Sequence, residues 1–407
     1  MGKKSFLLKG VSLLGLSLTL TAQDPWAVEV VSYVPGTNAH DGYQDPDVAL
    51  GRPTVDTYAD FESLDPEVAV VPIYAPWDFS ELVSIGEGGS LVLRLGTALT
   101  NDPAHPYGTD LLVFPYTFIT GTGNYDQYTQ DPRLFTLADA ATIGLYAEEK
   151  AGRVSLSADG VTWYDFPASE NFMRLLPTLG RGWTGSAWGD PTDPTFPPNP
   201  DLTLTDLAGM NLAELCRRYR GGAGGTGFDL ADLIPPQTGS LPTSFEYVRI
   251  SVPDDGDANT NFRIEIDAVT VVSPVSAYTR WTQQEFEWVA DPVHETPEAN
   301  PESDAFTNWQ EFARGGDPQA EETSLWIPAV SLSADRLRYT LPLSAEEAPW
   351  VIQVSDELGD AANWQKMSPQ PTAVDSPSED EVDRELPIPE PTVEGTRFFR
   401  VMLEDPA

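Results

Sequence analysis

The sequence is poor in the side chains that most often carry covalent chemistry. Its 407 residues include one cysteine, Cys216, and three histidines. One cysteine cannot form an intramolecular disulfide, so the stability of the fold must come from a buried core. The sequence also lacks H-E-x-x-H, G-x-S-x-G and any paired-histidine spacing, and no catalytic motif is recognised. We therefore expect a protein that is not an enzyme, with Cys216 packed as a small core residue.

Basic residues are scarce as well. The chain has 23 Lys and Arg against 63 Asp and Glu, and its formal net charge is −40. Binding to phosphate backbones depends on a surplus of Lys and Arg, so this charge excludes DNA and RNA as partners and disfavours anionic membrane surfaces. An acidic surface attracts cations and stays solvated. It fits a halotolerant secreted protein or one that binds calcium.

Apolar runs long enough to cross a bilayer are absent. Residues 1–22 combine a lysine-rich start with a short apolar stretch at 10–20 and small residues before Ala22, which is the layout of a secretory signal peptide. The alternative is an N-terminal membrane anchor. We expect cleavage after Ala22, no transmembrane segment in the mature chain, and a location outside the cytoplasm: extracellular, at the cell surface or periplasmic.

Pro and Gly are frequent, at 37 and 32 residues, and they separate short runs of β-forming residues. An Asp-Gly pair at 159–160 lies between two such runs, as in a hairpin turn. Apolar and polar side chains alternate in FRIEIDAV (262–269), which predicts a half-buried antiparallel strand with Arg263, Glu265 and Asp267 on its outer face. These patterns predict an all-β protein.

The pattern of strand-like runs gives way near residue 277 to short helical and acidic segments, which predicts separate structural units. Residues 23–276 are predicted to form one β-sandwich domain with long loops. Residues 277–320 are predicted to be a linker of short helices around an acidic loop. Strand-like runs within 321–407 predict a small C-terminal β-sandwich domain.

The linker contains a pattern similar to a twelve-residue calcium loop. In such loops alternate oxygen-bearing side chains converge on one cation, a glycine at position 6 makes the turn, and a final glutamate chelates the ion. Residues 300–311 have Ala305 at position 6, so the pattern is degenerate. The alternative is an acidic turn between two helices. The candidate ligands, at positions 1, 3, 5, 9 and 12, are Asn300, Glu302, Asp304, Asn308 and Glu311.

A second candidate metal site lies near the start of the mature chain. Asp41, Asp45 and Asp47 are closely spaced after the first predicted strand and could share a calcium ion with Asp267. A further acidic cluster at 254–257 is better explained by hairpin turn chemistry. The alternative for all of these carboxylates is a solvated surface.

Aromatic residues in the long loops are candidate ligand contacts. Sugar rings stack on aromatic faces, and loops on a rigid scaffold commonly carry binding. The alternative is that these aromatics fasten the loops to the sandwich. The candidates are Tyr116, Tyr125, Tyr128, Trp183 and Trp188.

The glycine-rich stretch at 211–233 could be mistaken for a site. It contains Cys216, an Arg-Arg-Tyr-Arg cluster and the run GGAGGTG. Its glycines do not follow the order of a phosphate-binding loop. Its arginines are expected to pair with nearby carboxylates, because the chain is so acidic. We expect a structural connection, with a short helix packed on the sandwich.

Segments across 26–272 resemble a family of uncharacterised secreted or cell-surface proteins of planctomycete- and verrucomicrobium-type bacteria. The order of an S-x-D-G-x-x-W hairpin, a Y-V-R-I strand and an E-I-D-A-V strand is also similar to discoidin and galactose-binding-like sandwiches. The resemblance implies a jelly-roll whose loops bind glycans, often with a structural calcium ion, and it lends no catalytic residue. The matching segments are VVSYVPG (30–36), DPDVALGRP (45–53), GGSLVLRL (88–95), HPYGTDLLVF (105–114), VSLSADGVTWYDFP (154–167), GGTGFDLADL (224–233), FEYVRI (245–250) and EIDAV (265–269).

The linker resembles one found before the C-terminal domains of secreted verrucomicrobial proteins. There a tryptophan-led helix precedes a D-x-D-G-L-T-N-x-x-E-like loop and a closing G-x-D-P. FTNWQEFARGGDP (306–318) keeps the ending, while the acidic positions before it differ. WVIQVSDELGDAANW (350–364) and TRFFRVML (396–403) match the small β-domain that usually follows.

From these features we predict a secreted, non-catalytic protein that binds a polysaccharide or surface glycan through loops of its N-terminal sandwich. One alternative is a structural or adhesive surface component without a sugar ligand. A second alternative is a glycoside-acting enzyme, since many carboxylates are present and catalytic pairs are defined by their separation in space.

Overall fold

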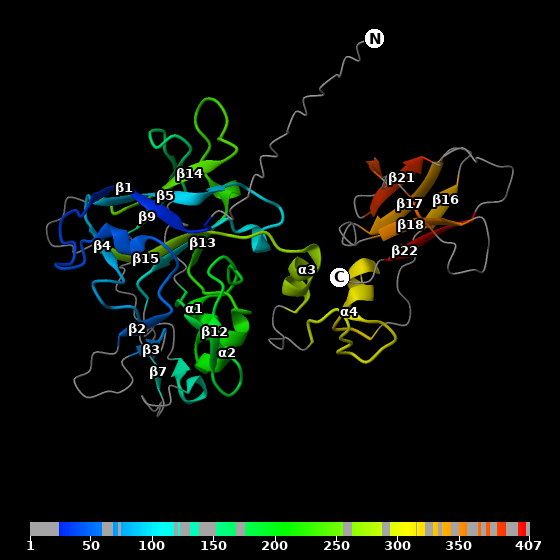
Figure 1. Cartoon of the computed structure of the whole chain (residues 1–407), viewed down its shortest axis with the longest axis horizontal. Helices are drawn as coiled ribbons and strands as arrows, with labels where there is room; N and C mark the ends of the chain where they lie inside the picture. Colours follow the sequence, from blue (N-terminus) through cyan, green and yellow to red (C-terminus); the bar gives the residue numbers. More distant parts are fainter. Residues whose placement is uncertain are drawn as a thin grey trace, which may run out of the picture.

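Figure 1 shows a computed structural model of the chain. The predicted signal peptide lies outside the described residues, as do Tyr125 and Tyr128. No described helix is both long enough and apolar enough to cross a bilayer. The structure describes residues 24–58, 68–71, 75–117, 121–122, 131–137, 152–167, 176–254, 263–286, 294–314, 316–321, 329–332, 336–342, 350–355, 365–367, 372–374, 381–387 and 398–403.

The N-terminal part is built from two facing antiparallel sheets (Figure 1). The first has the order β1 (Ala27–Val34), β5 (Ser90–Leu99), β14 (Phe245–Ser251), β9 (Arg153–Ser157) and β10 (Tyr164–Asp165). The second has the order β13 (Thr226–Phe228), β6 (Leu111–Pro115), β15 (Arg263–Val271) and β4 (Val83–Gly86). Every pair of named strands is antiparallel, which confirms the all-β sandwich, while the jelly-roll topology stays a prediction.

One hydrophobic core joins the two sheets. Leu91 and Leu93 of the first sheet are fully buried, as are Val113 and Ile266 of the second. The pleat of the strands explains this burial. In β14, for example, buried residues alternate with more exposed ones. Alternation of this kind directs one apolar face of each strand into the space between the sheets.

Strand β15 departs from the predicted half-buried pattern. Glu265 and Asp267, expected on a solvent face, are only 6% and 4% exposed. The outer face of β15 is covered, since Asp267 accepts hydrogen bonds from the backbone N and Oγ1 of Thr54 at 2.9 and 3.0 Å. The polar residues that alternate along β15 make buried polar contacts. The prediction that the outer face of this strand is solvated was wrong.

The long loop segments form a second, smaller core below the sandwich (Figure 1). Its apolar residues include Leu179, Leu212 and Leu215. The elements of this layer and of the connecting loops are short: β2 (Asp56–Tyr58), β3 (Val68–Val70), β7 (Gly121–Thr122), β8 (Thr136–Leu137), β11 (Arg181–Trp183), β12 (Trp188–Pro191), α1 (Leu204–Leu207), α2 (Leu212–Arg218) and the 3₁₀ turns η1 (Pro46–Ala49), η2 (Pro106–Gly108), η3 (Pro132–Leu134) and η4 (Leu230–Asp232).

Two helices, α3 (Ala277–Glu285) and α4 (Asn308–Arg314), lie between the sandwich and the C-terminal sheets (Figure 1). Trp281 and Phe312 of these helices share a buried cluster with Leu337 and Trp350 of the C-terminal strands. The helices therefore contribute to the core of the C-terminal unit. Its sheets are β16 (Ala329–Leu332), β17 (Arg336–Pro342), β21 (Glu381–Pro387) and β20 (Thr372–Val374), and β19 (Gln365–Lys366), β18 (Trp350–Ser355) and β22 (Phe398–Leu403).

Arg220 connects the sandwich part to helix α3. Its guanidinium donates to the carbonyl oxygens of Thr282 and Phe286 at 3.1 and 2.5 Å and pairs with Glu295 at 3.3 Å. Carbonyls at the C-terminal end of a helix lack intrahelical partners, so a cation there is favourable. The arginine fastens the end of α3 to the loop after α2.

Candidate functional site

The glycine-rich stretch is a packed structural connection, as predicted, but its helix α2 packs into the second core and not onto the sandwich core. Asn211 and Glu214 form a reciprocal capping box that starts α2. Cys216 is buried, and that burial raises the pKa of its thiol to about 12, which excludes a reactive thiolate near neutral pH. Gly225 has φ of +87°, and a Cβ there would lie 2.9 Å from the Phe114 ring. The glycine is required for chain packing at the start of β13.

Trp183 and Trp188 are packed against the second core. They face each other across the β11–β12 hairpin, with ring centroids 5.5 Å apart in an edge-to-face arrangement. Both contact the apolar cluster around α2, and the Arg133 guanidinium lies 5.5 Å from the Trp183 ring centroid. For these two residues the geometry matches the alternative in which aromatics fasten the loops to the fold.

Tyr116, in contrast, lines a pocket of about 250 Å³ beside strand β4. We call this the aromatic pocket. It combines aromatic rings with one cationic and one anionic side chain, which is the composition expected of a binding site. Its lining residues are His40, Tyr43, Trp77, Leu82, Tyr116, Arg263 and Glu265.

Pairing within the second sheet brings the walls of the aromatic pocket together. Arg263 and Glu265 of β15 lie opposite Gly86 and Ser84 of β4. On the other side of β15, the Tyr116 backbone N donates to the Glu265 carbonyl at 2.8 Å. The pocket is thus positioned by the central strand β15 and the edge strand β4, and the remaining rings come from residues in loops.

The turn that carries Trp77 is held at its backbone. The Glu81 carboxylate is 9% exposed and accepts from the backbone N atoms of Trp77 and Asp78 at 3.0 and 3.2 Å. It also accepts from Thr57 Oγ1 at 2.8 Å. The Tyr43 hydroxyl donates to the Trp77 carbonyl. The Trp77 side chain nevertheless stays 41% exposed, so a rigid turn presents an accessible ring.

Charged groups in the pocket are paired with each other. Arg263 Nε donates to Glu265 Oε1 at 2.9 Å, and Ser84 Oγ donates to the same oxygen at 3.3 Å. Burial, followed by the charges of Asp78, Glu265 and Glu81, raises the pKa of Tyr43, so its hydroxyl is protonated. The His40 ring stacks on the Tyr43 ring at 4.6 Å and 11°, which extends the aromatic wall.

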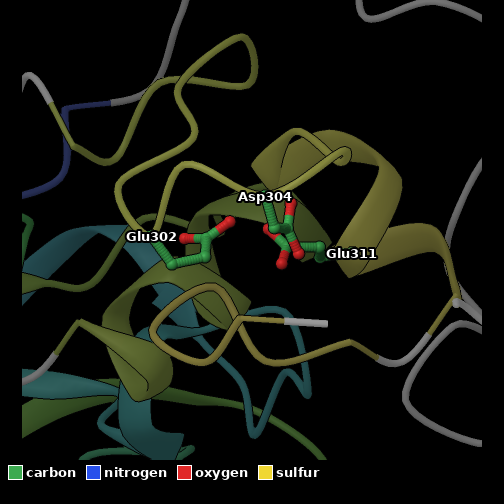
Figure 2. A group of neighbouring side chains, drawn as sticks. All are labelled: Glu302, Asp304 and Glu311. Atoms are coloured by element: carbon green, nitrogen blue, oxygen red, sulfur yellow. The ribbon is translucent and has the colours of Figure 1, made fainter. Parts of the chain in front are cut away.

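The acidic loop before α4 is a second candidate site. Carboxylate oxygens of Glu302, Asp304 and Glu311 all lie within 4.8 Å of one another. Figure 2 shows Glu302 and Asp304 on the loop directing their carboxylates toward Glu311, which projects from α4. Among the described residues this is the one group of three acidic, histidine or cysteine side chains with such a geometry. Glu311 is completely buried.

Asn300 and Asn308, the other predicted ligands in the loop, instead form hydrogen bonds with the backbone. Asn300 accepts from the Asp304 backbone N at 3.1 Å and donates to the Asp304 carbonyl at 3.0 Å. Asn308 is fully buried and donates to the carbonyls of His294 and Thr296. The left-handed residue is Ser303, with φ of +63°. The sharp turn therefore falls before Ala305, which is not among the described residues with a positive φ.

The structure does not bring the other predicted metal ligands together. Asp41, Asp45 and Asp47 are exposed, and they form no metal-holding group with Asp267. Asp45 instead accepts from the Asp47 backbone N and begins the turn η1. Asp267 faces inward to Thr54, and burial raises the pKa of its carboxyl to about 7. The shared calcium site predicted for these residues is not formed.

Most of the aromatic pocket was missed from the sequence. The pocket residues come from segments that are far apart in the chain, around 40–43, at 77 and at 263–265, and no spacing connects these segments. The sequence held one weak signal for the pocket: Arg263 and Glu265 both lie on the predicted outer face of the strand at 262–269. Comparison with known proteins adds no assignment, because no protein-family model matches the chain and no curated protein is detectably similar to it.

Proposed function

We propose that this chain is a secreted, non-catalytic protein that binds a polysaccharide or surface glycan through the aromatic pocket. The observation that carries the proposal is the exposed Trp77 ring beside an ion pair between the partly exposed Arg263 and the buried Glu265 in one concave site. A sugar ring offers C–H faces to an aromatic ring and hydroxyls to charged side chains, so both halves of this pocket have a counterpart on a glycan.

The support of the Trp77 turn strengthens the proposal. Ordering a mobile side chain or loop on binding costs free energy, and a site held in place beforehand avoids that cost. Glu81 and Tyr43 fix the turn from below, through the backbone of Trp77. We therefore expect the ring to keep its position in the absence of a ligand.

The test is a binding survey of the full chain against soluble and insoluble polysaccharides, compared with Trp77→Ala and with Trp188→Ala as a matched control. Binding that the first substitution removes and the second retains supports the proposal. Absence of binding to every glycan would sink it and favour the structural or adhesive alternative. Release of reducing sugar from a polysaccharide would favour a glycoside-acting enzyme.

We also propose that the acidic loop holds a calcium ion. Three carboxylates whose oxygens lie within 4.8 Å repel one another when ionised, and a cation between them removes that repulsion. Oxygen donors of this kind suit hard cations such as Ca²⁺. Glu302, Asp304 and Glu311 would hold the ion, at positions 3, 5 and 12 of the loop found in the sequence.

Thermal unfolding of the full chain in calcium and in chelator tests this second proposal. A ligand that binds the folded state stabilises it by about 2.7 kcal/mol at one hundred times its dissociation constant. We expect a higher midpoint in calcium, and we expect Asp47→Asn to retain the increase, because Asp47 lies outside the group of three carboxylates. Identical midpoints in calcium and chelator would reduce the loop to an acidic turn.

A further inference from the structure

We propose that the aromatic pocket selects neutral oligosaccharide chains over acidic ones, and that Phe79 provides a second stacking position for the neighbouring sugar. This inference rests on the proposed glycan-binding function and names its ligand class. It follows from the way the charges of the pocket are paired and from the residues that surround the Trp77 turn.

The first argument concerns the Arg263–Glu265 pair. The two side chains share one bond, from Nε to Oε1, at 2.9 Å. Within the described part of the chain no other side chain bonds the Arg263 Nη groups or Glu265 Oε2, and there donors and an acceptor lie side by side in the pocket. A sugar hydroxyl both donates and accepts, and adjacent hydroxyls satisfy both groups at once. A carboxylate or sulfate satisfies only the arginine.

The second argument concerns charge. The guanidinium is neutralised by its own partner, and Glu265 is only 6% exposed. Asp78 lies on the turn beside the pocket, and the chain as a whole carries a formal charge of −40. An acidic sugar would enter this negative field without an unpaired cation to receive it, so like-charge repulsion selects against it.

The third argument concerns Phe79. This ring is 64% exposed and is separated from Trp77 by one residue on the same turn. The turn is stiffened by Asp78, which accepts from the backbone N and Oγ of Ser80 at 2.8 and 2.6 Å. A large apolar side chain fixed in water beside a binding ring is best explained by a ligand that covers it. A glycan chain extending from the pocket would do so.

The experiment measures affinities of the full chain for matched series of neutral and acidic oligosaccharides, each from one to six sugars. The neutral series are gluco-, galacto-, manno- and xylo-oligosaccharides, and the acidic series are oligogalacturonates and sulfated oligosaccharides. We expect binding of a neutral series, tighter with each added sugar up to two or three. We expect Phe79→Ser to remove the gain from the second sugar without changing the affinity for the first.

Control variants separate specificity from folding. Val161 is 79% exposed and outside the pocket, so Val161→Ser should leave every affinity unchanged. Glu265→Gln keeps the shape of the side chain but leaves the arginine unneutralised. We expect it to weaken neutral binding by roughly tenfold or more, since hydrogen bonds to charged groups are the stronger ones, and to increase binding of the acidic series. Arg263→Gln should weaken neutral binding in the same way.

The outcomes distinguish this inference from the proposed function. Acidic oligosaccharides that bind as tightly as neutral ones would overturn the inference and leave glycan binding intact. An unchanged length dependence in Phe79→Ser would overturn the second stacking position. Binding of no oligosaccharide, or binding that Trp77→Ala does not reduce, would overturn the aromatic pocket as a glycan site altogether.

Discussion

The aromatic pocket and the acidic loop are built in opposite ways. The acidic loop takes its carboxylates from within the twelve residues 300–311, so they are neighbours in the sequence before the chain folds. The pocket takes its residues from segments as distant as His40 and Glu265, which meet only when β4 and β15 pair. One site depends on a local turn and the other on the register of a sheet.

Because of this difference, the two sites should respond differently when the packing of the fold is weakened. A local loop keeps its carboxylates near one another in the chain when packing elsewhere is weakened, whereas a pocket between strands is lost with the sheet that forms it. Variants can therefore separate the two sites.

The largest effect concerns Asp267, which the sequence pointed to as a calcium ligand and the structure buries beneath the sheet. Burial raises the pKa of its carboxyl to about 7, above the value of an unfolded aspartate. Its contribution to stability is therefore fully present below about pH 4 and is lost as the pH rises to about 7. In Asp267→Asn, which can keep both contacts to Thr54, this loss should disappear.

Urea unfolding of both proteins between pH 4 and 8.5 checks the prediction. The variant should gain stability relative to the parent protein as the pH rises, by up to about 4 kcal/mol, since one pKa unit corresponds to about 1.4 kcal/mol. The response to calcium should be unchanged. Parallel stability profiles for the two proteins would contradict the assignment.

The second prediction concerns Glu311, which is fully buried in the acidic loop. Glu311→Gln keeps the side-chain shape but removes a charge that calcium requires. The variant should lose the stabilisation by calcium, about 3 kcal/mol at saturating ion, and should keep glycan affinity. Calorimetric melting in calcium and in chelator is the measurement. A full calcium response in this variant would place the ion elsewhere.

The third prediction concerns Arg220, at the contact between the two regions. Arg220→Ala removes its bonds to the Thr282 and Phe286 carbonyls and to Glu295. We expect a loss of about 2 kcal/mol of stability, as is typical for hydrogen bonds from a charged group. Arg217→Ala is the matched control, because Arg217 is half exposed and lies 4.0 Å from Glu214.

The effect should also be localised. Calcium and glycan binding should both survive in Arg220→Ala, while proteolysis or hydrogen exchange should report loosening at α3. An arginine variant as stable as the parent protein would show that the contact contributes nothing. Loss of glycan binding would mean that the pocket depends on the position of the helices.

The smallest effect concerns the hydroxyl of Tyr43. Tyr43→Phe removes one hydrogen bond to the Trp77 carbonyl while keeping the ring that stacks on His40. The free energy of glycan binding should weaken by about 1 kcal/mol, which is the usual net contribution of such a hydrogen bond. Tyr219→Phe loses a similar bond, to the Pro177 carbonyl, far from the pocket lining. It should lower stability only. Equal affinities in both variants would exclude a role for the Tyr43 hydroxyl.

Several features were predictable because they depend on short stretches of sequence. Alternation in FRIEIDAV (262–269) indicated strand β15, and the capping pattern around Asn211 and Glu214 begins a helix that packs Cys216. The loop at 300–311 was visible because oxygen-bearing side chains recur at the alternate positions 300, 302 and 304. In each of these cases the relevant contacts lie within a few residues, so spacing alone carries the information.

Other features could not be predicted from spacing. The same alternation that identified β15 suggested an exposed face for Glu265 and Asp267, and both are buried. Whether a polar strand face meets water or another segment depends on what folds over it. Trp183 and Trp188 show the converse, because aromatic residues in a long loop turned out to close a second core.

Composition and short-range spacing were enough to predict the all-β class, the excess of acidic residues, the packed cysteine and the acidic loop that contains Glu302, Asp304 and Glu311. Each follows from composition or from side-chain spacing along a few residues. The burial of Asp267, and the meeting of Trp77, Tyr116 and Glu265 in one pocket, are visible only in the folded chain. Strand pairing brings together residues that are almost two hundred positions apart, and no local pattern encodes that contact.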